Sequence, residues 1–345
     1  MTLGPYSQQL VIGLGVGSIV LPTFFFGLRL WARRLRRTPL SAGDWLCFAG
    51  LVVSWTCCSL QLYAAVDGDL GQHQHLGPNG EIILDDPRFL VYERTKLAVN
   101  VLSPIGFALV KMSIVVLYEK IFHNIVPFRY LAYVMIVLLG IWGISFFFAN
   151  LFICYPVTAL IEPYYGNKCI DQASVFLSTL LTDLIFDILI LSMPIPVVLR
   201  LHLPWRDRFG VLGMFLLGAI VVAVSVARLI QNLEVNAQYL NFGNDVTYYT
   251  TAVFFWTNIE LSIAVIAACL PTLKPILSHF FPKTPTTTKS AQSTPSHYIQ
   301  ISESRQVTHK SRQSHMSDNY PAYSANAYAG DRDKNHIELH SFEPV

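Results

Sequence analysis

The chain has 345 residues, of which 53% are hydrophobic and only 13% are charged. Its mean hydropathy of +0.44 lies above the range of ordinary soluble globular proteins, so the composition excludes a soluble domain as the main body of the chain. The formal net charge of +2 is uninformative as a total, and its distribution along the chain carries the information.

Seven runs of about 20 apolar residues follow one another along the chain. They lie near 8–31, 43–66, 95–118, 129–153, 174–199, 209–232 and 249–273. Each run is long enough to cross a bilayer as a helix, whose backbone hydrogen bonds close internally where lipid offers no partners. The sequence therefore predicts an all-α membrane protein, a seven-transmembrane helix bundle over 8–280 that follows a short N-terminus over 1–7.

The connections between the runs alternate in charge. Arginines 29, 33, 34, 36 and 37 cluster at the end of the first run and in the connection that follows it, and Arg206 and Arg208 lie between the fifth run and the start of the sixth. The second connection is mostly acidic. By the positive-inside rule the N-terminus lies outside and the C-terminus is cytoplasmic. We interpret the first arginine cluster as a flank beside anionic lipid rather than as a nucleic-acid site, and predict a multi-pass protein of the plasma membrane.

The composition changes sharply after the seventh run. The segment 281–345 is polar, rich in serine and threonine, and without any apolar period. Such a composition cannot bury enough apolar surface to fold, so we predict a disordered cytoplasmic tail.

Two of the six cysteines, Cys154 and Cys169, fall near the outer ends of the fourth and fifth runs, on the oxidising side of the membrane. A disulfide between them would close a loop of about 15 residues and contribute about 3 kcal/mol in the chain-entropy model. Topology and compartment favour this disulfide over the alternative of two free thiols.

Five ionisable residues lie at membrane depth, where each is costly unless it is paired or faces water. They are Lys111, Asp183, Asp187, Arg228 and Glu260. Counting about 1.5 Å per residue places Asp187 and Glu260 near the midplane, Asp183 and Arg228 in the outer half, and Lys111 in the inner half. The depths favour pairing of Asp183 with Arg228 and then of Asp187 with Lys111, and leave Glu260 without a cation at its own level.

These five charges have two interpretations. In the structural one, they are mutual partners that fix helix packing. In the functional one, they line a polar cavity reached from outside, where they orient a ligand, an ion or a proton. We weigh the two evenly for Asp183 and Arg228, and favour function for Glu260.

Several motifs together resemble the fungal seven-helix "rhodopsin domain" integral membrane proteins, over roughly 20–280. The motifs are Asp44-Trp45, Gly71-Gln72-His73, Lys111 to Ile114 with Tyr118 and Phe122, Cys154-Tyr155-Pro156 with Cys169, Asp183 to Asp187 with Met193 to Pro196, Arg228, and Glu260 with Ala267 to Pro275. The resemblance implies a G-protein-coupled-receptor-like protein that senses an extracellular or membrane-borne ligand. A heterotrimeric G protein would be its partner.

In such a receptor the basic inner residues would face the effector: Arg33, Arg34, Arg36, Arg37, Arg206 and Arg208. The seventh run contains no lysine, so a retinal Schiff base of the usual rhodopsin kind has no attachment point there, and we expect no cofactor or metal.

Two other classes of function stay open. The first is a membrane-embedded enzyme or accessory protein of fungal secondary metabolism, in which a protonated Asp187 or Glu260 donates a proton to a lipophilic substrate. The second is a proton-coupled transporter that uses the same acids. The odd number of spans and the missing inverted repeat argue against a transporter. The sequence favours the receptor over an enzyme.

Overall fold

The computed structural model describes residues 8–68, 70–71, 86–155, 168–200, 205–242 and 246–273. Within these ranges seven helices are long and apolar enough to cross a membrane. The predicted seven-helix bundle is therefore confirmed, and the largest differences in a boundary are that the third helix begins at Pro87 and the helix of the sixth span continues to Phe242. The predicted N-terminus over 1–7 and the predicted disordered tail over 281–345 lie outside the described residues.

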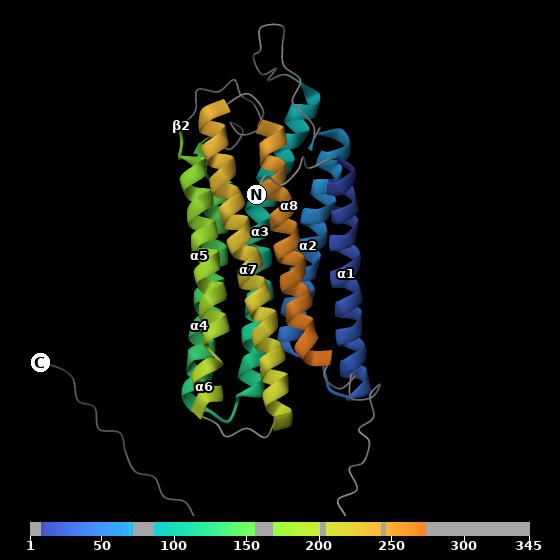
Figure 1. Ribbon diagram of the computed structural model, residues 1–345, viewed down its shortest axis with the longest axis vertical. Helices are drawn as coiled ribbons and strands as arrows, with labels where there is room; N and C mark the ends of the chain where they lie inside the picture. Colours follow the sequence, from blue (N-terminus) through green and yellow to red (C-terminus); the bar gives the residue numbers. More distant parts are fainter. Residues whose placement is uncertain are drawn as a thin grey trace, which may run out of the picture. The chain divides into compact units, whose positions relative to one another are not determined.

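Figure 1 shows the helices side by side along one axis. In chain order the elements are α1 (Gln8–Leu35), α2 (Ala42–Asp67), α3 (Pro87–Ile121), α4 (Val126–Leu151), β1 (Cys154–Tyr155), β2 (Lys168–Cys169), α5 (Gln172–Ser192), α6 (Ile195–Arg200), α7 (Trp205–Phe242), α8 (Val246–Cys269) and the 3₁₀ turn η2 (Leu270–Leu273).

Capping residues and prolines set several helix ends. Asp86 precedes α3 and accepts a hydrogen bond from the backbone N–H of Arg88 at 3.0 Å, and Pro87 occupies the first helical position, where no N–H is needed. A proline also ends α5. This helix stops at Ser192 because Pro194 has no N–H to continue the helical hydrogen bonds. The short helix α6 resumes the same span beyond this break.

Helices α3 and α8 form the interior of the bundle. In the most apolar stretch of 18 residues, 67% of the residues of α3 and 61% of those of α8 are buried, against 17–39% in the other five spans of the described chain. Helix α3 packs against α2, α4, α5 and α8, and α8 also packs against α1, α2 and α7. Side chains on α3 and α8 are therefore shielded from lipid by the surrounding helices, whereas Val137, Ile141 and Ile144 of α4 are 58–60% exposed on the outer surface.

Two glycines allow α2 and α4 to approach α3 closely. A Cβ atom at Gly50 of α2 would lie 2.5 Å from Cγ2 of Val110, and one at Gly143 of α4 would lie 2.7 Å from Cβ of Ala108. A small residue is needed at both positions, as in many contacts between membrane helices.

The strands β1 and β2 place the backbones of the two outer cysteines directly opposite each other. They pair antiparallel with Cys154 opposite Cys169, and Ile170 N–H donates to Ile153 O at 2.9 Å. The hydrogen-bonded pair is therefore Ile153 with Ile170, so the cysteines form the adjacent non-hydrogen-bonded pair, in which Cα atoms are about 4.5 Å apart. This backbone separation suits a disulfide. The bridge itself stays a prediction, because the side chain of Cys169 lies outside the described residues.

Candidate functional site

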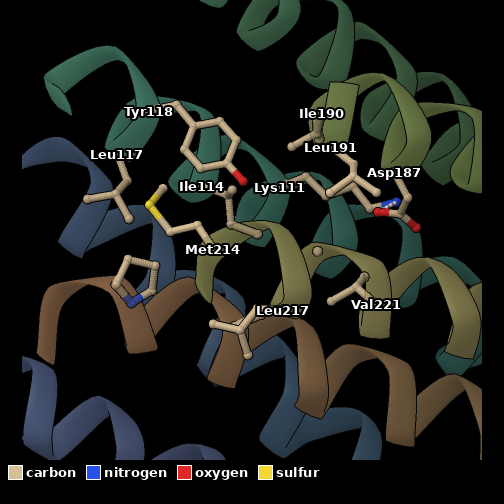
Figure 2. Close-up of a pocket in the computed structure, with 13 residues that line it drawn as sticks. Lys111, Ile114, Leu117, Tyr118, Asp187, Ile190, Leu191, Met214, Leu217 and Val221 are labelled. Atoms are coloured by element: carbon tan, nitrogen blue, oxygen red, sulfur yellow. Dashed lines mark ion pairs between the residues drawn. The ribbon is translucent and has the colours of Figure 1, made fainter. Parts of the chain in front are cut away.

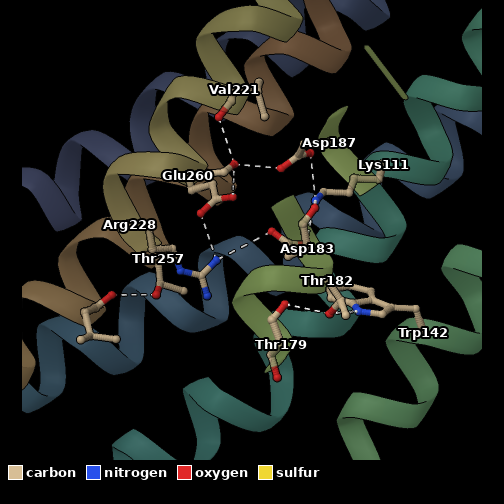
Figure 3. A network of polar contacts seen from close by, with 12 residues as sticks. Lys111, Trp142, Thr179, Thr182, Asp183, Asp187, Val221, Arg228, Thr257 and Glu260 are labelled. Carbon is tan, nitrogen blue, oxygen red and sulfur yellow. Dashed lines mark hydrogen bonds and ion pairs between the residues drawn. The ribbon is translucent and has the colours of Figure 1, made fainter. Parts of the chain in front are cut away.

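The five charged side chains predicted at membrane depth meet in the middle of the bundle (Figure 3). Each is at most 6% exposed. Together with one serine they form what we call the core cluster: Lys111 of α3, Asp183 and Asp187 of α5, Ser225 and Arg228 of α7, and Glu260 of α8. The cluster thus joins four helices. The two aspartates share a face of α5 because they are four residues apart.

Lys111 holds the two aspartates of α5 together. Its Nζ lies 2.7 Å from Oδ1 of Asp183 and 2.9 Å from Oδ1 of Asp187, and it donates to the backbone carbonyl of Asp183 at 3.0 Å. An ammonium group has three N–H donors, so all three are used. Lys111 therefore has no donor left for a ligand in this arrangement.

Ser225 connects the carboxylates of α5 and α8. Its Oγ lies 2.8 Å from Oδ2 of Asp187, 2.6 Å from Oε1 of Glu260 and 3.0 Å from the carbonyl oxygen of Val221 (Figure 3). All three neighbours are acceptors when both acids are ionised, whereas a serine hydroxyl carries one proton.

Arg228 completes the cluster on the side of α8. Its NH1 lies 3.0 Å from Oε2 of Glu260 and 4.0 Å from Oδ2 of Asp183, while its buried Nε has no hydrogen-bond partner among the described residues. Its Cζ lies 4.8 Å from the ring centroid of Phe107, and Nζ of Lys111 lies 5.8 Å from the same ring. Phe107 therefore contacts both cations of the cluster at cation–π distances.

These distances confirm one predicted pair and change the rest of the pairing predicted from depth. Lys111 lies 2.9 Å from Asp187, as predicted. Asp183, however, lies nearer to Lys111 than to Arg228. Glu260, which we expected to lack a cation, pairs with Arg228. The reason is that lysine and arginine have long flexible stems, so their charged groups lie well away from the depth of their own Cα atoms.

Carboxylate oxygens of Asp183, Asp187 and Glu260 lie within 4.8 Å of one another, close enough to share a metal ion. Lys111 and Arg228 already supply two positive charges against these three negative ones. A divalent cation would therefore leave a buried excess of positive charge, so the residues fit a metal poorly.

A cavity of about 40 Å³ adjoins the core cluster, between α3, α5, α7 and α8 (Figure 2). Lys111 and Asp187 lie at its polar end, and Tyr118, Met214 and Pro271 lie towards the inner ends of their helices. Water needs about 10–15 Å³, so a few molecules fit. We expected a cavity reached from outside, but this one lies on the predicted cytoplasmic side, and Asp183, Arg228 and Glu260 are not in its lining.

A second buried group of charges, which the sequence did not lead us to expect, lies where α1, α2 and α8 meet. We call Arg29, Arg33, Ser41 and Asp44 the end cluster. Arg29 is 1% exposed, and donates to Oδ1 of Asp44 at 2.8 Å and to the carbonyl of Ala268 at 2.6 Å. Asp44 also accepts from the backbone N–H of Ser41 at 2.8 Å and lies 3.2 Å from Nε of Arg33. Ser41 three residues before Asp44 is a capping-box pattern, a signal that could have identified this pair.

The predicted effector-facing arginines separate into three groups. Arg33 is only 20% exposed because it contacts Asp44. Arg34, Arg36 and Arg37 are exposed at the end of α1 and just after it. The side chains of Arg206 and Arg208 lie outside the described residues.

Comparison with known proteins identifies relatives of this bundle. Residues 28–279 match the family model of the fungal rhodopsin domain. The "Phomoidride biosynthesis cluster protein H" of a fungal species is 24% identical over 80% of this chain and 90% of its own length. The "Polyenoic acids biosynthesis gene cluster protein Ba17b" of Metarhizium anisopliae is 27% identical over 72% of this chain and 68% of its own length.

A third relative carries a receptor name. "Receptor GIN3" of Arthrobotrys oligospora is 23% identical over 83% of this chain and 67% of its own length. No solved structure matches the chain.

Proposed function

The chain belongs to the family of fungal rhodopsin-domain membrane proteins, and we propose that it acts as a G-protein-coupled-receptor-like sensor. The single observation that carries this proposal is the core cluster, which joins α3, α5, α7 and α8 through buried charges in addition to their apolar contacts. Buried charges hold their partners only at good geometry, so a small displacement of one helix is costly until the charges find new partners. A ligand that shifts α7 or α8 would therefore change the pairing of all four helices.

The cavity beside the cluster gives such a shift room on the inner side. It lies between α3, α5 and α7, and its wall includes Met214 and Leu217 of α7. Packed interiors resist deformation, so space beside a helix that no side chain fills marks where that helix can move. A movement of α7 into this cavity would displace the predicted effector-facing residues Arg206 and Arg208, which precede Met214 on the same helix.

The relative named "Receptor GIN3" supports a sensing role, since the match extends over 83% of this chain. We propose an extracellular or membrane-borne ligand, a heterotrimeric G protein as partner and the plasma membrane as location.

Proximity labelling from the C-terminus in a filamentous fungus tests the proposal. We expect a G-protein α subunit to be enriched with the wild-type chain, and the enrichment to be lost in the variant R206A/R208A. The matched control is R88A/R94A. It removes two exposed arginines from the first turns of α3, at the predicted outer end of the bundle. Equal enrichment in the two variants, or none with a well-expressed wild type, would overturn the receptor proposal.

A second candidate is an enzyme or accessory protein of secondary metabolism. The names of two relatives, which refer to phomoidride and polyenoic acid biosynthesis, favour it. A buried Glu260 could then act as a general acid towards a lipophilic substrate. The variant E260Q would accumulate an unprocessed precursor in a producing strain, with S262A on the same helix as control. An unchanged metabolite profile in E260Q would rule this candidate out.

A further inference from the structure

The hydroxyl of Ser225 has more acceptors than protons around it. It lies 2.8 Å from Oδ2 of Asp187 and 2.6 Å from Oε1 of Glu260. Both separations are hydrogen-bond distances for O–H···O contacts, so each needs a proton between its oxygens. Serine supplies only one proton. The other must belong to one of the two carboxyl groups.

The contacts of the two acids indicate which one carries it. Each acid has one oxygen beside a cation and one beside the hydroxyl of Ser225. Glu260 differs from Asp187 in its contact with the cation, Arg228, and this contact is the reason to place the proton on Glu260. A proton on Oε1 of Glu260 would donate to Ser225, and Ser225 would donate to Asp187.

Arg228 supports this assignment. An ionised glutamate facing arginine commonly accepts two parallel N–H bonds. Here Arg228 donates to Glu260 through NH1 alone, and its Nε is buried without a hydrogen-bond partner among the described residues. A single hydrogen bond of this kind is expected for a neutral carboxylic acid, which offers Arg228 only its carbonyl oxygen as an acceptor.

The charge balance of the cluster is a second, independent reason to expect one added proton. The groups that face it are Lys111 from α3, Asp183 and Asp187 from α5, Arg228 from α7 and Glu260 from α8, and Tyr118 of α3 also lines the cavity. No ion pair connects α2 or α4 to the cluster within the described ranges. Fully ionised, it would hold three negative and two positive charges, and one added proton makes it neutral. A buried unpaired charge is strongly unfavourable, so the neutral state is expected.

We propose that the core cluster binds one exchangeable proton, carried by Glu260 and transferable through the hydroxyl of Ser225 to Asp187. In the transfer the O–H bond of Glu260 breaks as a new one forms on Oγ of Ser225. The original proton of Ser225 passes at the same time to Oδ2 of Asp187. No charge enters or leaves, and one negative charge moves from α5 to α8.

The two proton positions correspond to two pairings of the bundle. With the proton on Glu260, Lys111 has two ionised partners and Arg228 has only the distant Asp183. With the proton on Asp187, Glu260 becomes an ionised partner for Arg228, and Lys111 keeps Asp183. The proton therefore decides whether α7 binds α8 or α3 binds α5 more tightly.

The cavity gives the proton a route to solvent. Asp187 lines it and Glu260 does not, so exchange must pass Glu260, Ser225, Asp187 and then water in the cavity. The proposal is independent of what the protein signals to, and holds equally if it is an enzyme.

Infrared difference spectroscopy on the purified full chain in lipid nanodiscs at neutral pH tests the proposal. We expect the carbonyl band of one protonated carboxylic acid, shifted in D₂O. The band is lost in E260Q, and also in D187N, because either substitution makes the cluster neutral without an added proton. It remains in the control S262A, which removes another buried hydroxyl. A band that persists in E260Q, or is missing in the wild type, would overturn the proposal.

Ser225 and competing ions are tested separately. The variant S225A keeps the charge balance, so it should retain the band but exchange with D₂O more slowly, and S225T should restore the rate. Unchanged exchange in S225A would overturn the relay. Replacing choline by Na⁺ should leave the wild-type band unchanged, and its loss in Na⁺ would show that a monovalent cation occupies the site instead.

Discussion

The core cluster and the end cluster are both buried ion-pair networks, yet they are built differently. In the end cluster one acid, Asp44, faces Arg29, Arg33 and the cap residue Ser41, so every contact supports the same arrangement. In the core cluster three acids compete for Lys111 and Arg228. An acid with surplus donors is locked in place, whereas acids that outnumber their cations have alternatives. The end cluster therefore fixes α1, α2 and α8, and the core cluster is where the bundle can change.

The largest effect should come from Lys111→Met. It leaves Asp183 and Asp187 facing each other without their shared cation, and breaking a buried pair in this way costs about 3–5 kcal/mol. Thermal unfolding of the purified protein in one detergent measures the loss. The control is Lys96→Met, whose partly exposed pair with Glu93 is worth about 0–1 kcal/mol. Equal stability of the two variants would show that the core cluster does not support the fold.

The next largest loss of stability should come from removing the predicted disulfide at the outer end of the bundle. If Cys154 and Cys169 form the predicted bridge, Cys154→Ser should destabilise the protein by about 3 kcal/mol, from a loop of about 15 residues. Maleimide labelling of the unfolded, unreduced chain should modify Cys47, Cys57, Cys58 and Cys269 in the wild type, and one more thiol in Cys154→Ser. Labelling of all six cysteines in the wild type would contradict the bridge.

Arg29→Met should cost less than Lys111→Met although Arg29 is as deeply buried. Asp44 keeps Arg33 and Ser41, so the loss is that of hydrogen bonds to a charged group, about 1.5–3 kcal/mol. The same unfolding assay measures it, with the exposed Arg34→Met as control. A loss as large as that of Lys111→Met would show that the remaining partners of Asp44 do not compensate.

A second substitution should rescue only the core cluster. Lys111→Met with Asp187→Asn leaves Asp183 beside Arg228, so the double variant should recover about 0.5–3 kcal/mol relative to additivity. Arg29→Met with Asp44→Asn should recover little, because the single variant Arg29→Met leaves Asp44 paired with Arg33 and Ser41, and the second substitution removes the charge that makes these contacts. Strict additivity in the core pair would contradict the shared network.

The fold was predictable because its signal is local. The length of an apolar run determines whether a helix can cross a bilayer, and this property needs no knowledge of neighbours. The break between α5 and α6 also follows from sequence, since Pro194 and Pro196 stand inside the fifth span.

The charged members of the core cluster were predictable, but of their pairing only the contact of Asp187 with Lys111 was. An ionisable residue inside an apolar run is visible in the sequence, whereas the reach of Lys111 and Arg228 depends on rotamers and helix rotation. Ser225 was missed because a serine gives no charge signal, although it lies three residues before Arg228 and hence on the same face of α7. The pairing of Arg29 was missed because this residue was grouped with the arginines of the connection, whereas helix α1 continues through it to Leu35.

The smallest effect concerns a charge outside both clusters, at the exposed start of α5. Asp171 accepts hydrogen bonds from the hydroxyl of Ser174 and from the N–H of Ala173, and these lower its pKa below the ordinary value of 3.8. A carboxyl with a lowered pKa in the folded state stabilises the fold above its unfolded pKa, and this contribution is lost as the pH falls through the folded value.

Asp171→Ala should therefore unfold at a slightly lower temperature than the wild type at neutral pH, and the difference should shrink below pH 3.8. Thermal scans of both proteins at the two pH values measure this difference, with Ser178→Ala, a hydroxyl one turn further along α5, as control. A difference that stays constant with pH would mean that the cap acts through its shape alone, without the charge that distinguishes the buried clusters.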